Sequence, residues 1–235
     1  MIFNLKVLLV GSGGREHALA WKISQSHLLK ELFIAPGNAG TEKLGENVEI
    51  PYTDIDGLVK FAKENLIDLT VVGPEEPLAN GLVDRFSHKG LKAFGPTAKA
   101  ARLESSKTFA KELMNDLSIP TASFSSVQTI VQARQEIQKL GLPVVIKADG
   151  LAAGKGVYIC QDLNDVEKSL NDLFIDRIFG ESGNKVLIEE FITGPEISVF
   201  AFTDGKTLSP LVAACDHKRI GEGDTGPNTG GMGAF

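Results

Sequence analysis

Short apolar runs and amphipathic stretches alternate between residues 5 and 96. The apolar runs have strand length and end at Gly or Pro turn signals; they are residues 6–11, 31–36, 47–50, 68–73 and 91–95. The stretches between them repeat apolar residues at helical spacing; they are residues 15–26, 54–65 and 78–90. Apolar strands that alternate with helices predict an α/β domain, with a parallel sheet covered by helices.

The pattern changes after residue 96. Residues 97–120 predict one helix that stops at Pro120. Strands and helices are expected beyond it at 122–127, 130–140, 165–175 and 185–191, with a β-hairpin around 147–157. Asp204-Gly205, between two apolar runs, predicts a two-residue hairpin turn. Residues 216–235 are glycine-rich without periodicity, which predicts a long functional loop.

Composition narrows the possible partners. The 235 residues carry a formal net charge of −6 without basic runs, which argues against nucleic acid and anionic membranes. Cys160 and Cys215 show no metal-ligand spacing and fit small core residues in a reducing compartment. The apolar segment 5–10 is too short for a signal peptide, and no run reaches membrane-spanning length, so we expect a soluble, cytoplasmic protein.

The glycine-rich segment 147–157 looks like a phosphate-binding loop but does not fit the Walker A pattern. Only three residues separate Gly150 from Gly154, and Gly156 rather than Ser or Thr follows Lys155. Both flanks read as strands, so the loop is expected to close a β-hairpin rather than to open a helix.

Two loops follow predicted parallel strands and are candidates for ligand contact. The loop of Gly11, Gly13 and Gly14 turns a strand into a helix, but Glu16 stands where a dinucleotide fingerprint has its third glycine. It is therefore either a tight packing turn or a phosphate site at a helix N-terminus. Glu75, after a later strand, is either a solvated turn charge or a contact to a hydroxyl or amine of a small ligand.

Charged residues on apolar strands form a second group of candidates. Lys147 shares a strand face with Val145, and a lysine there needs an anion or an internal salt bridge. Lys155 is either a mobile phosphate contact or an exposed lysine. Glu189 and Glu190 end an apolar strand and are expected on opposite faces.

The last segment gathers side chains of both charge signs around glycines. Its polar candidates are Asp216, His217, Lys218, Arg219, Asp224 and Asn228. A mixed charge run is either a solvated face or a site for a zwitterion or a phosphate.

Together these segments resemble the glycinamide ribonucleotide synthetases (phosphoribosylamine–glycine ligases) of the ATP-grasp superfamily. The matching stretches occur in family order and span essentially the whole chain: GSGGREHALAWK, APGNAGT, DLTVVGPEEPL, FGPTAKAARLESSK, PVVIKADGLAAGKGV, LIEEF and DHKRIGEGDTGPNTGGMGA. The first and last are specific to this family, whereas the lysine-glycine hairpin alone indicates only an ATP-grasp ligase.

The resemblance implies a fold and a domain division. A Rossmann-like pre-ATP-grasp domain with a parallel sheet is expected at 1–101, followed by an α+β ATP-grasp region. Residues 102–122 and 193–235 would belong to the incomplete ATP-grasp core, and 123–192 to its lid subdomain.

The resemblance also implies a reaction. ATP phosphorylates the carboxylate of glycine, and the amine of 5-phosphoribosylamine attacks the acyl phosphate, which releases ADP and phosphate. The expected partners are these small molecules, with Mg²⁺ or Mn²⁺, and a monomer is favoured.

Site residues follow from the resemblance position by position. Those implied for phosphoribosylamine are Gly11, Gly13, Gly14, Arg15, Gly37, Asn38 and Glu75. Those implied for ATP are Lys107, Lys147, Gly154, Lys155, Gly156, Glu189, Glu190, Phe191 and Glu196. Those implied for glycine and the transferring phosphate are Asp216, Lys218, Arg219 and Asn228.

The chain departs from the family pattern in three ways. Gly194-Pro195-Glu196 stands where members commonly have Gly-Glu-Glu, and Ser105 replaces a usual glycine. The family continues beyond residue 235 and carries its metal ligands there, so no residue is assigned to the metal and the chain is expected to be inactive alone. A nucleotide-sugar or dinucleotide module, a non-catalytic nucleotide sensor and another ATP-grasp carboxylate–amine ligase remain as alternatives.

Overall fold

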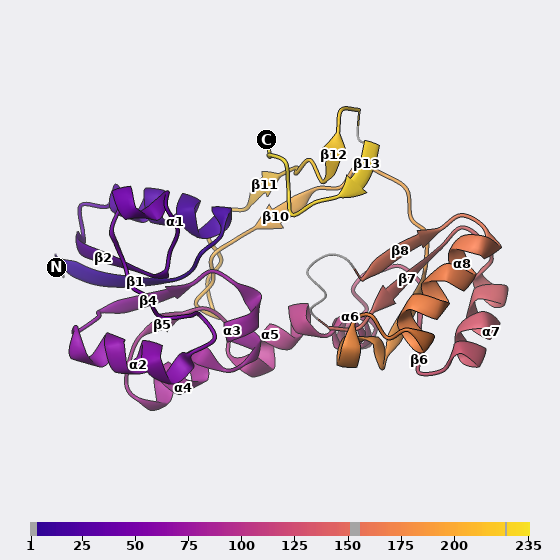
Figure 1. Cartoon of the computed structure of the whole chain (residues 1–235), viewed down its shortest axis with the longest axis horizontal. Helices are drawn as coiled ribbons and strands as arrows, with labels where there is room; N and C mark the ends of the chain where they lie inside the picture. Colours follow the sequence, from indigo (N-terminus) through magenta and orange to yellow (C-terminus); the bar gives the residue numbers. More distant parts are fainter. Residues whose placement is uncertain (1–3, 151–155, 224) are drawn as a thin grey trace. The chain divides into compact units, whose positions relative to one another are not determined.

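The computed structural model describes residues 4–150, 156–223 and 225–235, which fall into two compact units (Figure 1). The first unit is Met1–Ala110 and the second is Lys111–Phe235. Each unit has its own buried apolar core.

The first unit is built on a five-stranded sheet in the order β3-β2-β1-β4-β5. Its strands are β1 Leu5–Gly11, β2 Leu29–Pro36, β3 Glu46–Asn47, β4 Leu69–Val72 and β5 Ala93–Phe94. Every neighbouring pair is parallel. The predicted parallel sheet is confirmed, although the third and fifth strands are only two residues long.

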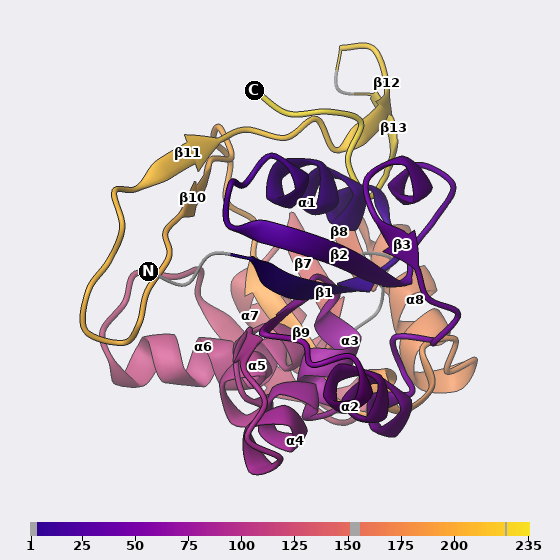
Figure 2. The same ribbon diagram turned by 90° about the vertical axis from the view of Figure 1, so that its left-hand side faces the viewer.

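Helices cover both faces of this sheet (Figure 2). They are α1 Gly14–Ser24, α2 Ile55–Glu64, α3 Glu75–Ala79, α4 Leu82–His88 and α5 Ala98–Ser105, with a short 3₁₀ turn at Thr41–Lys43. Leu9 in β1 packs with Ala20 of α1, whereas the next residue, Val10, packs on the other face with Leu58 of α2 and Phe86 of α4. The strands are apolar throughout because side chains on both faces are buried.

The strand order of the first sheet reverses direction at β1. The chain passes from β1 to β2 on one side and later adds β4 on the other side of β1. Ligands of open α/β sheets bind at the carboxyl ends of strands where the order reverses in this way. The loops after β1 and β4 therefore lie at the position most favourable for a ligand.

The second unit contains a four-stranded antiparallel sheet in the order β6-β9-β7-β8. Its strands are β6 Phe124–Val127, β7 Val144–Ala148, β8 Val157–Cys160 and β9 Val186–Glu190. The helices are α7 Ile130–Leu140 and α8 Leu163–Leu170, followed by a π-helical turn Asn171–Ile175 and a 3₁₀ turn Gly180–Gly183. The expected hairpin of β7 and β8 is confirmed, and α7 ends at Gly141, which has a positive φ of 80°.

Buried apolar side chains lie on both faces of the second sheet. Ile146 and Ile188 pack into the core with residues of α7 and α8. Since neighbouring residues of a strand point to opposite faces, Lys147 and Glu189 lie on the other face, together with the buried Leu187. These two charged residues are therefore kept apart from the core formed with α7 and α8.

The single helix expected over 97–120 is wrong, because the chain forms two helices. They are α5 and α6 Lys107–Asp116, separated by Ser106 in an extended conformation with φ −138° and ψ 104°. The Ser106 hydroxyl accepts a hydrogen bond from the Phe109 amide at 3.2 Å and so caps α6. Serine competes for backbone donors in this way, which favours helix ends over helix interiors.

The two-residue turn expected at Asp204-Gly205 is also wrong in size. Strands β10 Ser198–Phe200 and β11 Val212–Ala214 pair antiparallel, but an isolated bridge joins Thr203 and Leu208 within their connection. The Asp204 carboxylate accepts hydrogen bonds from the amides of residues 206 and 207 at 2.9 and 2.7 Å. Those bonds favour an Asx-type turn that is wider than two residues.

The segment 216–235 is not a loop throughout. It contains an antiparallel pair, β12 Arg219–Gly221 and β13 Thr225–Asn228. Backbone pairing rather than apolar alternation defines this hairpin, so periodicity could not reveal it. In the part of the chain that is described, no helix combines the length and apolarity that crossing a bilayer needs.

Candidate functional site

The loop after β1 is built around a buried carboxylate. Gly13 is the N-cap of α1, and its amide donates a 2.6 Å hydrogen bond to Glu16 Oε2. The Glu16 side chain lies against Gly11 and Gly73 so closely that a Cβ on either glycine would come within 2.4 and 2.2 Å of its atoms. With Glu16 only 5% exposed, the space between the loops after β1 and β4 is filled.

Sequence reasoning treated Glu16 only as the residue that breaks the dinucleotide fingerprint. The spacing of Gly13 and Glu16 is that of a capping box, in which the acid at the third helical position returns to the N-cap amide. That signal could have predicted the inward position of Glu16.

The side chains of Arg15 and Glu75 meet at the carboxyl ends of β1 and β4. Arg15 extends from the first turn of α1, and its Nη1 donates to Glu75 Oε1 at 2.7 Å and to the Gly73 carbonyl at 3.0 Å. Glu75 is the first residue of α3, directly after the loop that follows β4. The side chains keep exposed fractions of 59% and 42%, so both remain accessible to a ligand.

The ion pair shifts both groups toward their charged forms. The hydrogen bond that Arg15 donates to the Glu75 carboxylate is the main reason that the pKa of Arg15 is raised. Burial acts to raise the pKa of the Glu75 carboxyl, but the hydrogen bond from Arg15 and one from a backbone amide outweigh it and hold that pKa below its usual value. A guanidinium and a carboxylate are therefore both presented at this sheet edge.

Asn38 ties the loop after β2 to the loop after β1. Its Nδ2 donates to the Ser12 carbonyl at 2.8 Å, while its Oδ1 accepts from the Gly40 amide at 2.8 Å. Gly37, with φ +75°, has no room for a side chain, because a Cβ there would lie 2.1 Å from Asn47 Oδ1. The structure thus brings the residues predicted for phosphoribosylamine to one edge of the sheet: Gly11, Gly13, Gly14, Arg15, Gly37, Asn38 and Glu75.

A second charged cluster lies on the face of the antiparallel sheet that points away from α7 and α8. Glu189 of β9 is only 4% exposed, and its Oε2 is 2.9 Å from Lys147 Nζ and 3.2 Å from Lys111 Nζ. The internal salt bridge considered for Lys147 is therefore present. Glu189 is shared by a second lysine, Lys111 of α6, which sequence reasoning missed.

The other candidate residues in and around β9 lie in different surroundings. Glu190 is exposed, and its Oε1 accepts a hydrogen bond from the Ser123 amide at 3.0 Å, so the two acids face opposite sides as predicted. Phe191 follows the strand and is partly buried, and Gly156 directly precedes β8. The predicted residues Gly154 and Lys155 lie outside the described residues.

The remaining candidates are spread over the chain. Lys107 is the first residue of α6. Glu196 forms an ion pair with Lys218, which links a residue predicted for ATP to one predicted for glycine. Arg219 Nη1 donates to the Gly226 carbonyl at 3.1 Å across the β12–β13 hairpin.

Two further candidates in the final segment take part in backbone pairing. Asn228 pairs with Arg219 in the β12–β13 hairpin. Asp216 forms an antiparallel bridge with Ala234. Asp224 lies outside the described residues.

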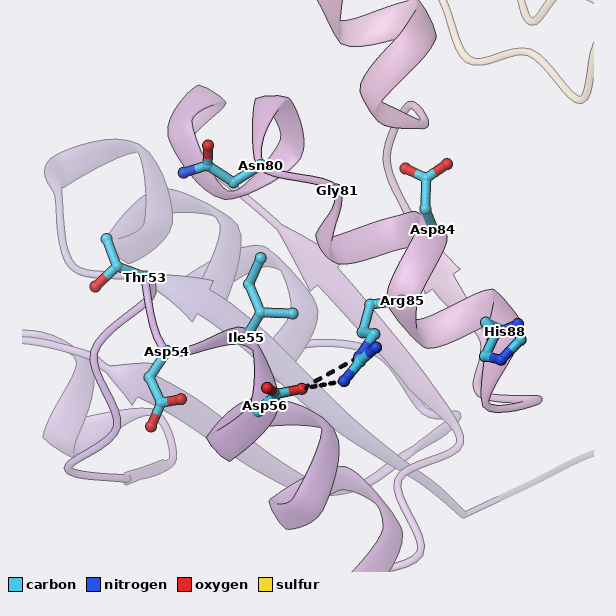
Figure 3. Close-up of a pocket in the computed structure, with 9 residues that line it drawn as sticks. All are labelled: Thr53, Asp54, Ile55, Asp56, Asn80, Gly81, Asp84, Arg85 and His88. Atoms are coloured by element: carbon cyan, nitrogen blue, oxygen red, sulfur yellow. Dashed lines mark hydrogen bonds and ion pairs between the residues drawn. The ribbon is translucent and has the colours of Figure 1, made fainter.

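One hollow of the first unit shares no lining residue with these clusters (Figure 3). It has a volume of about 840 Å³ and lies between the start of α2 and α4. Its carboxylates and its arginine already have structural roles: Asp54 caps α2, Asp84 accepts from the Ala98 amide, and Asp56 pairs with Arg85 at 2.8 Å. These contacts account for the three carboxylates and the arginine of the lining without a ligand.

A metal site does not follow from the described residues. None of the described Asp, Glu, His and Cys side chains form a group of three or more that could hold a metal ion. Hard divalent cations take several oxygen ligands. The described residues therefore do not fit a Mg²⁺ site of their own.

Two family models together match almost the whole chain. The N domain of phosphoribosylglycinamide synthetase matches residues 5–104, and the ATP-grasp (A) domain of the same enzyme matches residues 105–235. The chain belongs to the phosphoribosylglycinamide synthetase family. This result confirms the family and the ATP-grasp fold class predicted from the motifs.

Similar proteins agree with this family assignment. A phosphoribosylamine–glycine ligase of Escherichia coli K12 is 50% identical over 98% of this chain and 54% of its own length. The crystal structure of a phosphoribosylamine–glycine ligase of Thermotoga maritima superposes with a TM-score of 0.82 at 36% identity, over 98% of this chain and 55% of that one. The chain thus spans about half the length of these family members.

A more distant structure supports the fold alone. An N5-carboxyaminoimidazole synthetase of Staphylococcus aureus complexed with ADP superposes with a TM-score of 0.67 at 16% identity, over 93% of this chain and 56% of that one. The domain boundaries and the site residues predicted from the sequence stay predictions.

Proposed function

We propose that the full-length protein joins glycine to 5-phosphoribosylamine in purine biosynthesis, and that this ligation is coupled to the cleavage of ATP to ADP and phosphate. The observation that carries the proposal is the consecutive match of both phosphoribosylglycinamide synthetase domains to residues 5–104 and 105–235. A dinucleotide-binding module is disfavoured because the Glu16 side chain fills the loop where a pyrophosphate would need open backbone.

The loops after β1, β2 and β4 would hold phosphoribosylamine. The Arg15 guanidinium, in the first turn of α1, would supply a full positive charge for the phosphate. The Glu75 carboxylate can accept a hydrogen bond from a hydroxyl or an amine of the same ligand. The proximity of Arg15 and Glu75 supports a ligand that carries both a phosphate and an amine.

The antiparallel sheet would hold the phosphates of ATP. Lys147 would contact them from β7, and Gly156 and Lys155 would approach from the hairpin loop. Glu189, Glu190 and Phe191 would border the adenosine. A buried anchor for Lys147 supports this assignment, because Glu189 fixes the ammonium group at a defined position on the strand.

The proposed chemistry makes the glycine carboxylate reactive. Transfer of the γ-phosphoryl group of ATP forms glycyl phosphate, so that the attacking amine displaces phosphate instead of an oxide ion. Cationic side chains lower the barrier by stabilising the charge that develops on the phosphoryl oxygens. Lys218 and Arg219 would serve the transferring phosphate, and Asp216 and Asn228 would orient glycine.

ATP-grasp chemistry uses a divalent metal ion with the nucleotide, and we propose Mg²⁺ or Mn²⁺ for the full-length protein. Because the described residues do not fit such a site, no step of the mechanism is assigned to the metal through them. A cytoplasmic location, a monomeric state and small molecules as the only partners stay predictions.

An assay of phosphate release from ATP tests the proposal. The full-length protein is expected to release phosphate only when glycine and 5-phosphoribosylamine are both present, with formation of glycinamide ribonucleotide. Turnover without one of the two substrates, or none with both, would contradict the proposed reaction.

A further inference from the structure

Lys111 is the residue of the buried cluster that the proposed function does not use. Its side chain is 12% exposed, and its ammonium lies 3.2 Å from Glu189 Oε2. It also donates to the Thr121 hydroxyl at 2.8 Å and to the Ala122 carbonyl at 3.3 Å, and it lies 5.7 Å from the centre of the Phe124 ring. Several neighbours therefore hold the ammonium group in one place.

The charges of the cluster do not balance. Glu189 supplies one negative charge, whereas Lys111 and Lys147 supply two positive ones. Both lysines contact the same carboxylate oxygen, and Glu189 Oε1 is buried without a hydrogen-bond partner among the described residues. One positive charge is therefore in excess.

The two lysines differ in how they are held. The Lys147 side chain is 25% exposed, about twice as much as that of Lys111. Among the described residues, Lys147 Nζ forms one hydrogen bond, to Glu189. Lys111 is fixed by three further groups. The excess charge is thus better available on Lys147 than on Lys111.

We propose that Lys111 is a positioning residue: it neutralises Glu189, so that Lys147 keeps an uncompensated positive charge for a nucleotide phosphate. Without Lys111, Glu189 and Lys147 form a closed neutral pair, and an approaching phosphate has to compete with a buried carboxylate for the same ammonium. The inference rests on the proposed function in assuming that Lys147 contacts ATP.

Charge-balanced variants of the full-length protein test the inference. Lys111→Met gives a neutral cluster, Lys111→Arg keeps the charge, and the double variant Lys111→Met/Glu189→Gln returns the cluster to one net positive charge. Lys139→Met is the control, since Lys139 forms an ion pair with Glu136 on the exposed surface of the same unit. Isothermal titration with ADP and with adenosine separates the phosphate contribution from that of the base and ribose.

Lys111→Met is expected to weaken ADP binding about tenfold, the effect of one lost phosphate interaction, while adenosine affinity stays within about twofold. Lys111→Arg is expected to bind ADP within about threefold of the wild type, because the charge is kept. Since Glu189 is itself proposed to border the adenosine, the double variant is judged by the ratio of its ADP affinity to its adenosine affinity. That ratio is expected to return to within about threefold of the wild-type ratio, because the net charge is restored. Lys139→Met should match the wild type.

Three results would overturn the inference: unchanged ADP affinity in Lys111→Met, an equal loss for adenosine, or a double variant whose ratio of ADP to adenosine affinity is as low as that of Lys111→Met. If Lys111→Met does not fold, the double variant decides, since it carries no buried carboxylate at position 189. A tenfold loss of ADP affinity there, without a loss of adenosine affinity, defeats the proposal.

Lys147→Met separates this inference from the proposed function. Unchanged ADP affinity in Lys147→Met means that Lys147 does not contact the nucleotide, and the assignment of ATP to this sheet fails. A loss in Lys147→Met without one in Lys111→Met defeats only the inference about Lys111.

Discussion

Arg15 and Glu75 are separated by 60 positions in the sequence, yet their side chains share a 2.7 Å hydrogen bond at the carboxyl ends of β1 and β4. Exposed ion pairs of this kind contribute little to stability, typically about 0–1 kcal/mol. The pair is therefore better explained by what it presents to a ligand than by what it adds to the fold.

Arg15→Met is expected to raise the KM for 5-phosphoribosylamine about tenfold or more, because a charge-assisted contact to the phosphate is lost. The pKa of Glu75 is expected to rise, since the bond from Arg15 lowers it. Steady-state kinetics of the full-length protein and carbon-13 NMR of the Glu75 carboxyl measure the two effects.

Arg134→Met provides the matched control. Arg134 of the second unit forms a comparable exposed pair with Glu167, with hydrogen bonds of 3.0 and 2.7 Å. Its loss should leave KM unchanged. Equal kinetic effects of the two substitutions would remove Arg15 from the substrate site.

The sequence predicted the positions of side chains correctly where they depend on neighbouring residues. It predicted them incompletely where they depend on residues far away in the chain. The opposite faces of Glu189 and Glu190 followed from strand alternation alone. The second lysine on Glu189 could not be foreseen, because it depends on how a helix packs against a strand that lies far away in the sequence. The position of Glu16 could have been predicted, since its capping-box spacing from Gly13 is visible in the sequence.

At the scale of elements, strand–helix alternation predicted the first unit and its parallel sheet. The errors were at places where side chains compete with regular structure. Ser106 divides a stretch that looks like one helix, and Asp204 widens a turn by bonding to amides beyond it. The β12–β13 pair was missed because glycine-rich strands show no apolar alternation.

Ser106→Ala is expected to destabilise the protein by about 0.5–2 kcal/mol, the usual cost of removing an N-cap hydroxyl. Ser106→Asp, which keeps an acceptor for the Phe109 amide, is expected to retain most of the stability. Urea unfolding followed by circular dichroism measures both variants. An alanine variant as stable as the wild type would mean that the hydroxyl does not cap α6.

At the scale of the whole molecule, paired carboxylates link stability to pH. Glu31, Glu136 and Glu167 have lowered pKa values because Lys6, Lys139 and Arg134, respectively, donate hydrogen bonds to them. A carboxyl whose pKa is lower in the folded state stabilises the protein above its unfolded pKa, and that contribution is lost as pH falls through the folded value.

The midpoint of urea unfolding is therefore expected to be nearly constant from pH 6 to pH 8 and to fall below about pH 4. Glu167→Gln should make the acid decline slightly shallower, because one of the linked groups is removed. A midpoint that stays constant down to pH 3 would contradict the linkage.

The buried position of Glu16 has a consequence for how the family can vary. Its side chain occupies the space that a side chain at Gly11 or Gly73 would need. A larger residue at either glycine position thus requires a smaller one at position 16. Substitutions at these three positions are therefore expected to occur together in members of the family. An aligned set of family members in which the three positions vary independently would show that the loops after β1 and β4 can separate without loss of the fold.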